Sequence, residues 1–512
     1  MADAKAATGF YGHAGALVSL AFILVIVVAM GAAGWITLRE GSTRFLLPFT
    51  TDNATQQVTA AVEAARRNPD PASLRAVSEE MWGLSKLTDA KRFTDSRLME
   101  QGIYYTTMPR TNQVLMLVHV LFAAFCMLLG GLQFWPAFRK RFMKAHRTVG
   151  AIYIITVPVG VVTAMAYMAL TPPHHIYDHL VAWIALWVFG ALALFAIAMA
   201  VRGLRQRRIF EHQAWMALSF GCLMVAPLLR MDWALLAWIF PAIDQETLNL
   251  VTVGMMLPEV LLIAYGLILV NRQYARPMKQ RVAAPIAGPS RDIFLQALPL
   301  LQALGLLLLG SNIFFYLAGA GMSSMPSAQA LIPAALLARE QAVLLAYPLA
   351  TGLFAISTGL AFFAVLFSLG QLLQNIALPA RGSITALLGL LAGLSSCFIG
   401  WHIGLVPERI LFSGGTLYMV NGLVLTGFSL LLLCAGRVGQ HALMKESLVF
   451  LLCLLPFPTL FFLTLYVVSH VSLPADYIAA GQGFVIPVGF SAGLLFLAMF
   501  YVVYGQATRE HN

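Results

Sequence analysis

The stretch Leu117–Arg139, LVHVLFAAFCMLLGGLQFWPAFR, shows the feature that decides the fold of this chain, a long apolar run that recurs many times. It is apolar over the length of about 20 residues that a helix needs to cross about 30 Å of hydrocarbon. One histidine, His119, lies inside the run, and basic residues follow it. Because hydrocarbon offers no hydrogen-bond partners, the backbone of such a run must satisfy itself within one helix. The stretch therefore predicts a membrane-spanning helix that carries a polar ring.

Similar apolar runs recur along the whole chain. The 512 residues are 60% hydrophobic and 11% charged, with a mean hydropathy of +0.80, which excludes a water-soluble globule. The first run is too long for a signal peptide and lacks its cleavage pattern, so we expect a retained helix. The sequence predicts an all-α polytopic membrane protein with about twelve transmembrane helices, at 14–37, 113–138, 149–171, 180–201, 214–241, 247–270, 294–319, 342–373, 383–405, 416–436, 448–469 and 483–505.

The expected organisation has five parts. A first transmembrane helix (1–37) leads into an extracytoplasmic helical insert (38–112). A five-helix core with paired histidines (113–270) follows, and a basic, proline-rich linker (271–293) joins it to a six-helix C-terminal membrane domain (294–512).

The formal net charge of +10 indicates orientation rather than a nucleic-acid partner, because no soluble domain could bind one. Lys and Arg gather in the loops after the second, fourth and sixth spans, whereas the alternate loops are poor in them. By the positive-inside rule, both termini and the linker are cytoplasmic, and we expect a bacterial inner-membrane protein surrounded by lipid. The sequence does not indicate an oligomeric state.

Four histidines alternate between the two ends of successive spans. His119 and His179 fall at the predicted outer ends of the second and fourth spans, and His146 and His212 at the inner ends of the third and fifth. A haem iron with two imidazole ligands needs one neutral ring nitrogen from each side, and alternate helices of a bundle can supply it. The hypothesis is two b-type haems, one held by each pair.

Three of the four histidines can also be explained without haem. His146 and His212 border basic loops, where an interfacial histidine is ordinary. His179 follows His174 and His175 in the short loop TPPHHIYDH, and that cluster could be solvated or bind a metal ion. The sequence leaves these alternatives open.

Other polar residues could assist haem binding or form a separate site within the membrane. Arg139 and Arg147 could hold haem propionates through charge-assisted hydrogen bonds, or they could serve only topology and contact with anionic lipid. Arg230 and Asp232 lie late in the fifth span, and Glu259 follows a proline near the middle of the sixth. Because a lone ionised carboxylate is costly there, Arg230 and Glu259 form a candidate ion pair or proton site.

Several local motifs resemble a known family. Leu117–Arg139 followed by HRTVG at 146–150, together with EHQAWM at 211–216, resembles a bacterial membrane-protein family, domain of unknown function 2306, over about residues 113–270. The family name implies no activity. The histidine placement is also similar to that of two-haem transmembrane cytochromes b of the b-561 group. That likeness implies one haem between the second and fourth helices and another between the third and fifth, but the group's substrate-site motifs are missing.

The chain has no dinucleotide-binding motif, no P-loop and no C-x-x-C-H motif for attached haem. A redox activity would therefore need a separate donor and acceptor, such as a quinol, a small reductant, a metal ion or another protein. The leading hypothesis is a transmembrane oxidoreductase that moves electrons through two haems. The alternatives are a haem-free transporter or assembly factor that uses Arg230 and Glu259, and a membrane metal-binding protein that uses the loop histidines.

Overall fold

The computed structural model describes residues 13–50, 54–68, 70, 104–105, 107–176, 179–274, 289–319, 321–332, 334–374, 381–405, 414–473, 475 and 485–507. These residues form helices and turns, and none of them lies in a strand. Ten of the described helices are long and apolar enough to cross a membrane, or eleven if one bent pair counts as a single span. The protein is thus an all-helical polytopic membrane protein, as predicted.

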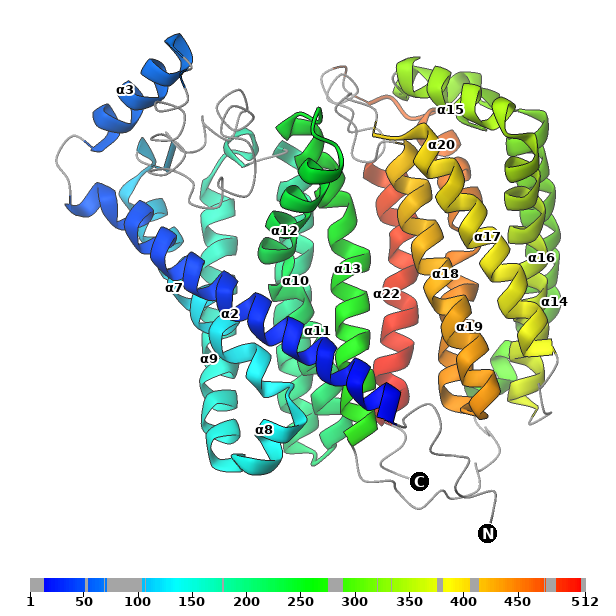
Figure 1. Ribbon diagram of the computed structural model, residues 1–512, viewed down its shortest axis with the longest axis horizontal. Coiled ribbons are helices and arrows are strands. Elements are labelled where there is room, and N and C mark those ends of the chain that lie inside the picture. The colour runs from blue at the N-terminus through cyan, green and yellow to red at the C-terminus, as the bar shows by residue number, and fades with distance from the viewer. Residues whose placement is uncertain are drawn as a thin grey trace. The chain divides into compact units, whose positions relative to one another are not determined.

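The chain divides into two compact units (Figure 1). The N-terminal unit comprises Leu17–Tyr274 with Val503–Asn512, and the C-terminal unit comprises Met1–Ala16 with Ala275–Val502. The border at Tyr274 falls inside the stretch 271–293 that the sequence analysis takes as a linker.

The first helix is longer than its apolar run. Helix α2, His13–Thr50, continues past the predicted end at residue 37 into the segment expected to form the insert. Within that segment α3, Ala54–Arg67, is the helix expected there, while 71–103 lies outside the described residues. Helix α2 packs closely on α7: a Cβ at Gly34 would lie 2.8 Å from Leu128 Cγ, and one at Gly131 would lie 3.3 Å from Val27 Cα.

The other helices of the N-terminal unit are α7 (Arg110–Gln133), α8 (Pro136–Arg141), α9 (Met143–Leu170), η2 (Pro173–His175), α10 (His179–Arg205), α11 (Ile209–Leu223), α12 (Val225–Ile239) and α13 (Gln245–Tyr274). The predicted fifth span is two helices, α11 and α12, which bend by 51°. Pro227 lies in the first turn of α12, where its missing N–H costs no intrahelical bond and its ring favours the break.

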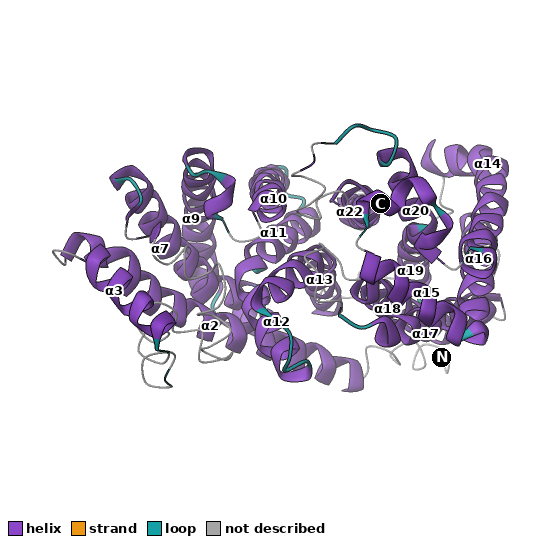
Figure 2. Ribbon diagram, turned by 90° about the horizontal axis from the view of Figure 1, so that it is seen from above, coloured by secondary structure: helices purple, strands orange, loops and turns teal. Residues whose placement is uncertain are grey.

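Four of these helices close into a ring. Helix α7 packs against α9, α9 against α10, α10 against α11, and α11 returns to α7. Over the described residues, α7 and α10 are not packed along their lengths, and neither are α9 and α11. In this order of contacts, α7 is diagonal to α10 and α9 is diagonal to α11. Figure 2 shows α9, α10 and α11 roughly end-on.

The C-terminal unit contains α14 (Pro289–Asn312), the π-helical turn η3 (Ile313–Ala318), the 3-10 turns η4 (Gly321–Ser324) and η5 (Pro326–Leu331), α15 (Ala334–Ala346), α16 (Pro348–Leu373), α17 (Arg381–Ile403), α18 (Gly414–Val438), α19 (His441–Leu454), α20 (Phe457–Val468) and most of α22 (Val485–Ala507). The predicted eighth span begins as a separate helix, α15, which lies across the ends of its neighbours in Figure 1. The break falls at Tyr347, where Pro348 starts α16.

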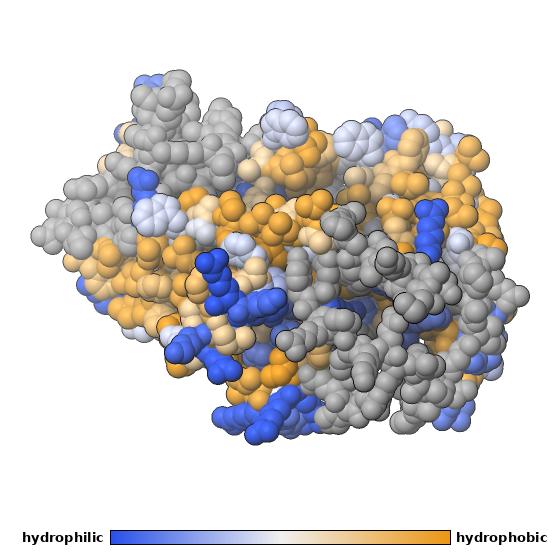
Figure 3. Space-filling view, turned by 60° about the horizontal axis from the view of Figure 1, so that its bottom comes forward, coloured by the Kyte–Doolittle hydropathy of each residue, from blue (hydrophilic) through white to orange (hydrophobic). Residues whose placement is uncertain are grey.

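Large apolar side chains cover the outward faces of the spans. Ile155, Leu306 and Leu349 are each more than half exposed. On the face drawn in Figure 3, hydrophobic side chains predominate over the described helices, and hydrophilic side chains gather toward one edge. Apolar surface of this extent is not stable in water, and it fits contact with lipid.

Candidate functional site

His146 and His212 occupy equivalent places in two helices. Each is the fourth residue of its helix, α9 and α11 respectively, and these helices are one of the diagonal pairs of the ring. The Nδ1 atom of His212 lies 3.0 Å from the carbonyl oxygen of Ala200. Because a carbonyl only accepts, Nδ1 carries the proton and donates it, and Nε2 keeps its lone pair. This is the tautomer that ligates a metal through Nε2.

Arg139 joins the two histidines at the same end of the ring. The charges of Arg139, His146 and His212 lie close enough together to interact, and exposed Arg147 also interacts with His146. Arg139 Nη2 donates to Asn271 Oδ1 of α13 at 2.6 Å. Burial lowers the pKa of Arg139 from its usual value, because the low dielectric disfavours its charge. An anionic group at this place would be stabilised by the buried guanidinium.

The same end contains buried polar atoms without hydrogen-bond partners. They include both amide atoms of Gln133 and the Nδ1 atom of His146. Gln133 Oε1 lies 3.4 Å from where a Cβ would stand at Gly150, which places the amide against the first turns of α9. Buried polar groups in native proteins nearly always have partners, so these atoms indicate a ligand or ordered water at this position.

The structure does not bring His119 and His179 to the same depth. His119 Nδ1 donates to the carbonyl of Gly160 at 2.8 Å, well inside α9. Trp183 of α10 donates to the carbonyl of Met168 at 3.2 Å, near the end of α9. His179 begins α10, one turn beyond Trp183. The offset is eight residues along α9 and four along α10, so at 1.5 Å per residue the His179 backbone lies roughly 18 Å from the level of His119. The side chain of His179 is outside the described residues.

The loop histidines are engaged with aromatic rings. His175 stacks on Tyr104 with ring centroids 3.9 Å apart, and its ring lies 4.1 Å from that of His174. Burial, and then the neighbouring His174, lower the pKa of His175. Among the described residues no group of three or more His, Cys, Asp or Glu could hold a metal ion, so the predicted loop metal site gains no support from them.

Arg230 and Glu259 do not form an ion pair. Arg230 Nη1 donates to the carbonyl of Ala226 at 3.0 Å, and its guanidinium lies 5.5 Å from the ring centre of Trp233. Glu259 instead lies close enough to Asp232 on α12 for the two carboxyl groups to interact. Two ionised carboxylates so close together would repel each other. The partner of Glu259 is a second acid, which its separation in sequence did not indicate.

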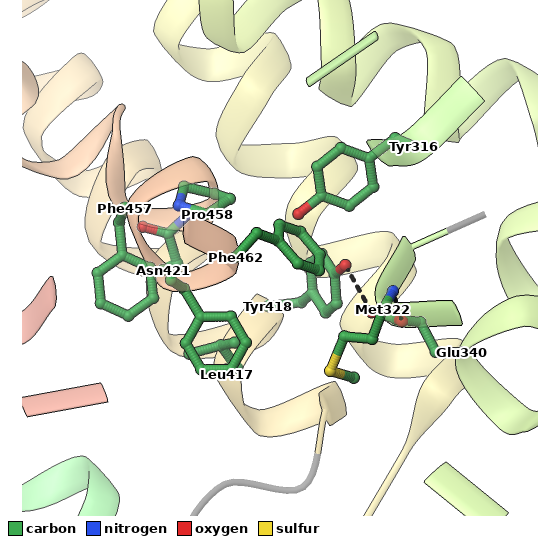
Figure 4. A pocket seen from close by; sticks show the side chains of 10 residues that line it. Tyr316, Met322, Glu340, Leu417, Tyr418, Asn421, Phe457, Pro458 and Phe462 are labelled. Atoms are coloured by element: carbon green, nitrogen blue, oxygen red, sulfur yellow. Dashed lines mark hydrogen bonds between the residues drawn. The ribbon is translucent and has the colours of Figure 1, made fainter. Parts of the chain in front are cut away.

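A second polar centre lies in the C-terminal unit, around Glu340. The sequence analysis did not single this residue out. Glu340 is 1% exposed and accepts hydrogen bonds from Met322 N and Tyr418 Oη (Figure 4). The sequence does show a lone acidic residue at the edge of an apolar run, which could have marked a site. Its partners, Met322 and Tyr418, could not be identified from the sequence, because they belong to other elements.

One comparison with known proteins finds a match. Residues 116–267 match the family model described as "Predicted membrane protein (DUF2306)", which confirms the resemblance expected over about residues 113–270. Neither the curated proteins nor the solved structures contain a match to the chain. The family segment spans α7 to α13 and so contains all four of the predicted histidines, His119, His146, His179 and His212.

Proposed function

We propose that the N-terminal unit is a membrane electron-transfer protein that binds b-type haem between His146 and His212. The observation that carries the proposal is the placement of these two histidines, in the same turn of diagonally opposed helices, with the His212 Nδ1–H bound to the Ala200 carbonyl. Bound haem would supply one-electron redox chemistry, which no group of this chain provides.

The residues around the pair fit such a group. His146 and His212 would ligate the iron through their Nε2 atoms. The buried charge of Arg139, and Arg147 beside it, would hold propionate carboxylates. The unpartnered amide of Gln133 would gain a hydrogen-bond partner. The chain would act as an oxidoreductase with a separate donor and acceptor, such as a quinol, a small reductant, a metal ion or another protein.

The second haem of the sequence-based hypothesis does not enter this proposal. An iron held by two imidazoles needs both rings at one depth, and the backbones of His119 and His179 differ in depth by roughly 18 Å. Electrons would therefore pass between one membrane face and a partner that reaches the haem from the same face or from the hydrocarbon.

We place the histidine pair at the cytoplasmic face of a bacterial inner membrane, with both termini cytoplasmic. The basic residues of α8 and the C-terminal turn of α10 lie at the same end of the ring as the pair. The positive-inside rule assigns that end to the cytoplasm. A single cysteine introduced at Gln206, in a variant without the native cysteines, should react with an impermeant maleimide only after the membrane is opened. Labelling of intact cells would reverse the orientation.

The visible spectrum of the purified protein tests the haem. Protein from haem-replete cells should show reduced bands of low-spin b-type haem, with about one haem per chain. His146→Ala and His212→Ala should each remove most of the haem, whereas the control His174→Ala, in the loop at the opposite end, should keep it. Folded but colourless wild-type protein would exclude the proposal.

A haem-free transporter or assembly factor is the second candidate, because two carboxyl groups, those of Asp232 and Glu259, lie close together between α12 and α13. Buried acids inside membrane helices commonly mark a proton or ion path. Under this candidate, Glu259→Gln would abolish function without changing any optical spectrum. Under the haem proposal, the same variant would keep its haem.

A further inference from the structure

Glu340 lies at the centre of a polar pocket in the C-terminal unit. Its Oε2 atom accepts a hydrogen bond of 2.6 Å from the backbone N–H of Met322, and its Oε1 atom accepts one of 2.9 Å from the hydroxyl of Tyr418. Tyr418 in turn is within hydrogen-bonding distance of the hydroxyl of Tyr316 (Figure 4). Helices α15 and α18 and the turns η3 and η4 therefore converge on one carboxyl group.

The backbone is shaped to meet this carboxyl group. The chain leaves α14 through a π-helical turn and then forms two short 3-10 turns, so regular helix is interrupted beside the acid. Gly321, with φ +80°, stands so close that a Cβ there would collide with the Glu340 carboxylate. Only glycine allows both this conformation and this approach. In membrane proteins, irregular backbone of this kind typically lines a binding site.

No basic side chain neutralises Glu340. Over the described residues, no Lys, Arg or His forms an ion pair with it. The adjacent Arg339 donates instead to the carbonyls of His402 and Ile403, at 3.0 and 3.3 Å. The polar groups that face the carboxyl are the Met322 N–H and the hydroxyls of Tyr418 and Tyr316. An ionised Glu340 would therefore be a buried and uncompensated negative charge.

The pocket beside the carboxyl offers further oxygen atoms. It is lined by Tyr316 and Tyr418 near Glu340, and by Asn421 with aromatic rings of α20 at its far side (Figure 4). The Asn421 side chain is buried, with 6% exposed, and its Oδ1 atom has no hydrogen-bond partner. The space holds about one or two water molecules, which excludes a larger ligand.

We propose that this pocket binds a small monovalent cation, a proton or Na⁺, through the Glu340 carboxylate with the hydroxyl oxygens of Tyr316 and Tyr418. Hard cations prefer carboxylate and hydroxyl oxygens, and one carboxylate balances one positive charge. Either ligand would neutralise a charge that no described basic side chain pairs with.

Burial raises the pKa of Glu340 to about 7, against the opposing effect of the bonds from Met322 and Tyr418. The carboxyl group would therefore exchange its proton near neutral pH. A proton or ion at Oε2 competes with the Met322 N–H for the same oxygen, so occupancy of the pocket would loosen the turns that begin at Gly321.

Infrared difference spectroscopy of the full-length protein in lipid nanodiscs tests the proposal. In a choline buffer without Na⁺, a carboxylic acid band should titrate with a midpoint near pH 7. The band should be missing in Glu340→Gln and present in the control Glu259→Gln, which alters an acid of the N-terminal unit. Adding Na⁺ distinguishes the ligands: a lowered midpoint identifies Na⁺, and an unchanged midpoint identifies a proton. No Glu340-dependent band and no effect of Na⁺ would overturn the proposal.

Tyr418→Phe keeps the test decisive if Glu340→Gln fails to fold. The variant retains the ring but removes the donor to Oε1, and that bond favours the charged carboxylate. The midpoint should rise by about one pH unit, a tenfold increase in proton affinity. Tyr347→Phe, which changes a ring beside His402, should leave it unchanged. A midpoint equal in all three proteins would contradict the proposal.

Discussion

Replacing Gly400 by alanine should separate two helices that support the Glu340 pocket. Helices α17 and α18 meet backbone to backbone through glycines. A Cβ at Gly400 would lie 2.6 Å from the carbonyl oxygen of Gly415 and 2.7 Å from the backbone nitrogen of Met419. Ordinary contact begins near 3.4 Å, so the helices must separate by about 0.8 Å, the difference between 3.4 and 2.6. Backbone atoms cannot turn aside as a flexible side chain could.

The cost combines two opposing effects. Overpacking of a tight contact destabilises by about 1–3 kcal/mol, and alanine in a helix recovers about 0.5–1 kcal/mol over glycine. A net loss of about 1–2 kcal/mol is expected. The displacement also affects the site, because Tyr418 follows Gly415 by one turn. If α18 takes up the 0.8 Å, the 2.9 Å bond from Tyr418 to Glu340 lengthens to about 3.7 Å, beyond hydrogen-bonding range.

Thermal unfolding in one detergent measures this effect against a matched control. Gly427 lies on α18 as well, and a Cβ there would meet nothing within 4 Å. Gly427→Ala should therefore be slightly stabilising, by about 0.5–1 kcal/mol, through helix propensity alone. Opposite signs for the two alanines are the expected result. A Gly400→Ala protein as stable as Gly427→Ala would refute the close approach of α17 and α18.

Three further outcomes are expected. Gln133→Leu should lower the haem content of the purified protein, measured by absorbance, because the amide would lose a ligand contact; without a ligand, removing two unpartnered polar atoms would be neutral or stabilising. Asp232→Asn should keep its melting temperature, since an amide of the same size leaves a polar group beside Glu259, whereas Asp232→Leu should lose about 1–3 kcal/mol. The folded pKa of Glu340 is raised from 4.5 to about 7, so its contribution to stability is complete below pH 4.5 and is lost as pH rises to about 7. Over that interval the free energy of unfolding should fall by about 3 kcal/mol, from 2.5 units at about 1.4 kcal/mol each, and Glu340→Gln should abolish the fall.

The membrane spans could be predicted from the sequence because the lipid bilayer restricts their structure. An apolar run of membrane length has few stable states other than a transmembrane helix. Interruptions inside a run carry a weaker signal. Pro227 and Pro348 both mark breaks, but Pro158 lies inside the continuous helix α9 and Pro258 inside α13. Whether a proline breaks a span depends on which neighbours satisfy the freed carbonyl. Hydropathy does not contain that information, and so one predicted span became α15 and α16.

For the polar sites too, the sequence indicated which residues needed partners but not which partners they had. Residue type indicated that Glu259 needed a partner, because an isolated carboxylate in hydrocarbon is costly. It did not indicate which partner, and Arg230, two residues from Asp232, was the natural choice because it carries the opposite charge. Arg230 and Asp232 are two residues apart on α12, so they point in different directions, and only Asp232 faces Glu259. Glu340 was missed because its partners, Met322 and Tyr418, are brought to it by irregular turns.

The histidine pairs show why spacing along the chain is a poor measure of depth. The separations to successive histidines are similar, at 27, 33 and 33 residues, and suggest regular alternation. Depth, however, is set by the distance of a residue from the start of its own helix. His146 and His212 are each the fourth residue of parallel helices, so they lie at one level. His119 is the tenth residue of α7 and His179 the first of α10, a difference of nine residues or about 13.5 Å. Contacts of α9 with both helices give a similar offset by an independent route. Two imidazoles that share an iron must lie at one level, so the proposal expects about one haem per chain, and the haem content of the purified protein tests that number against two.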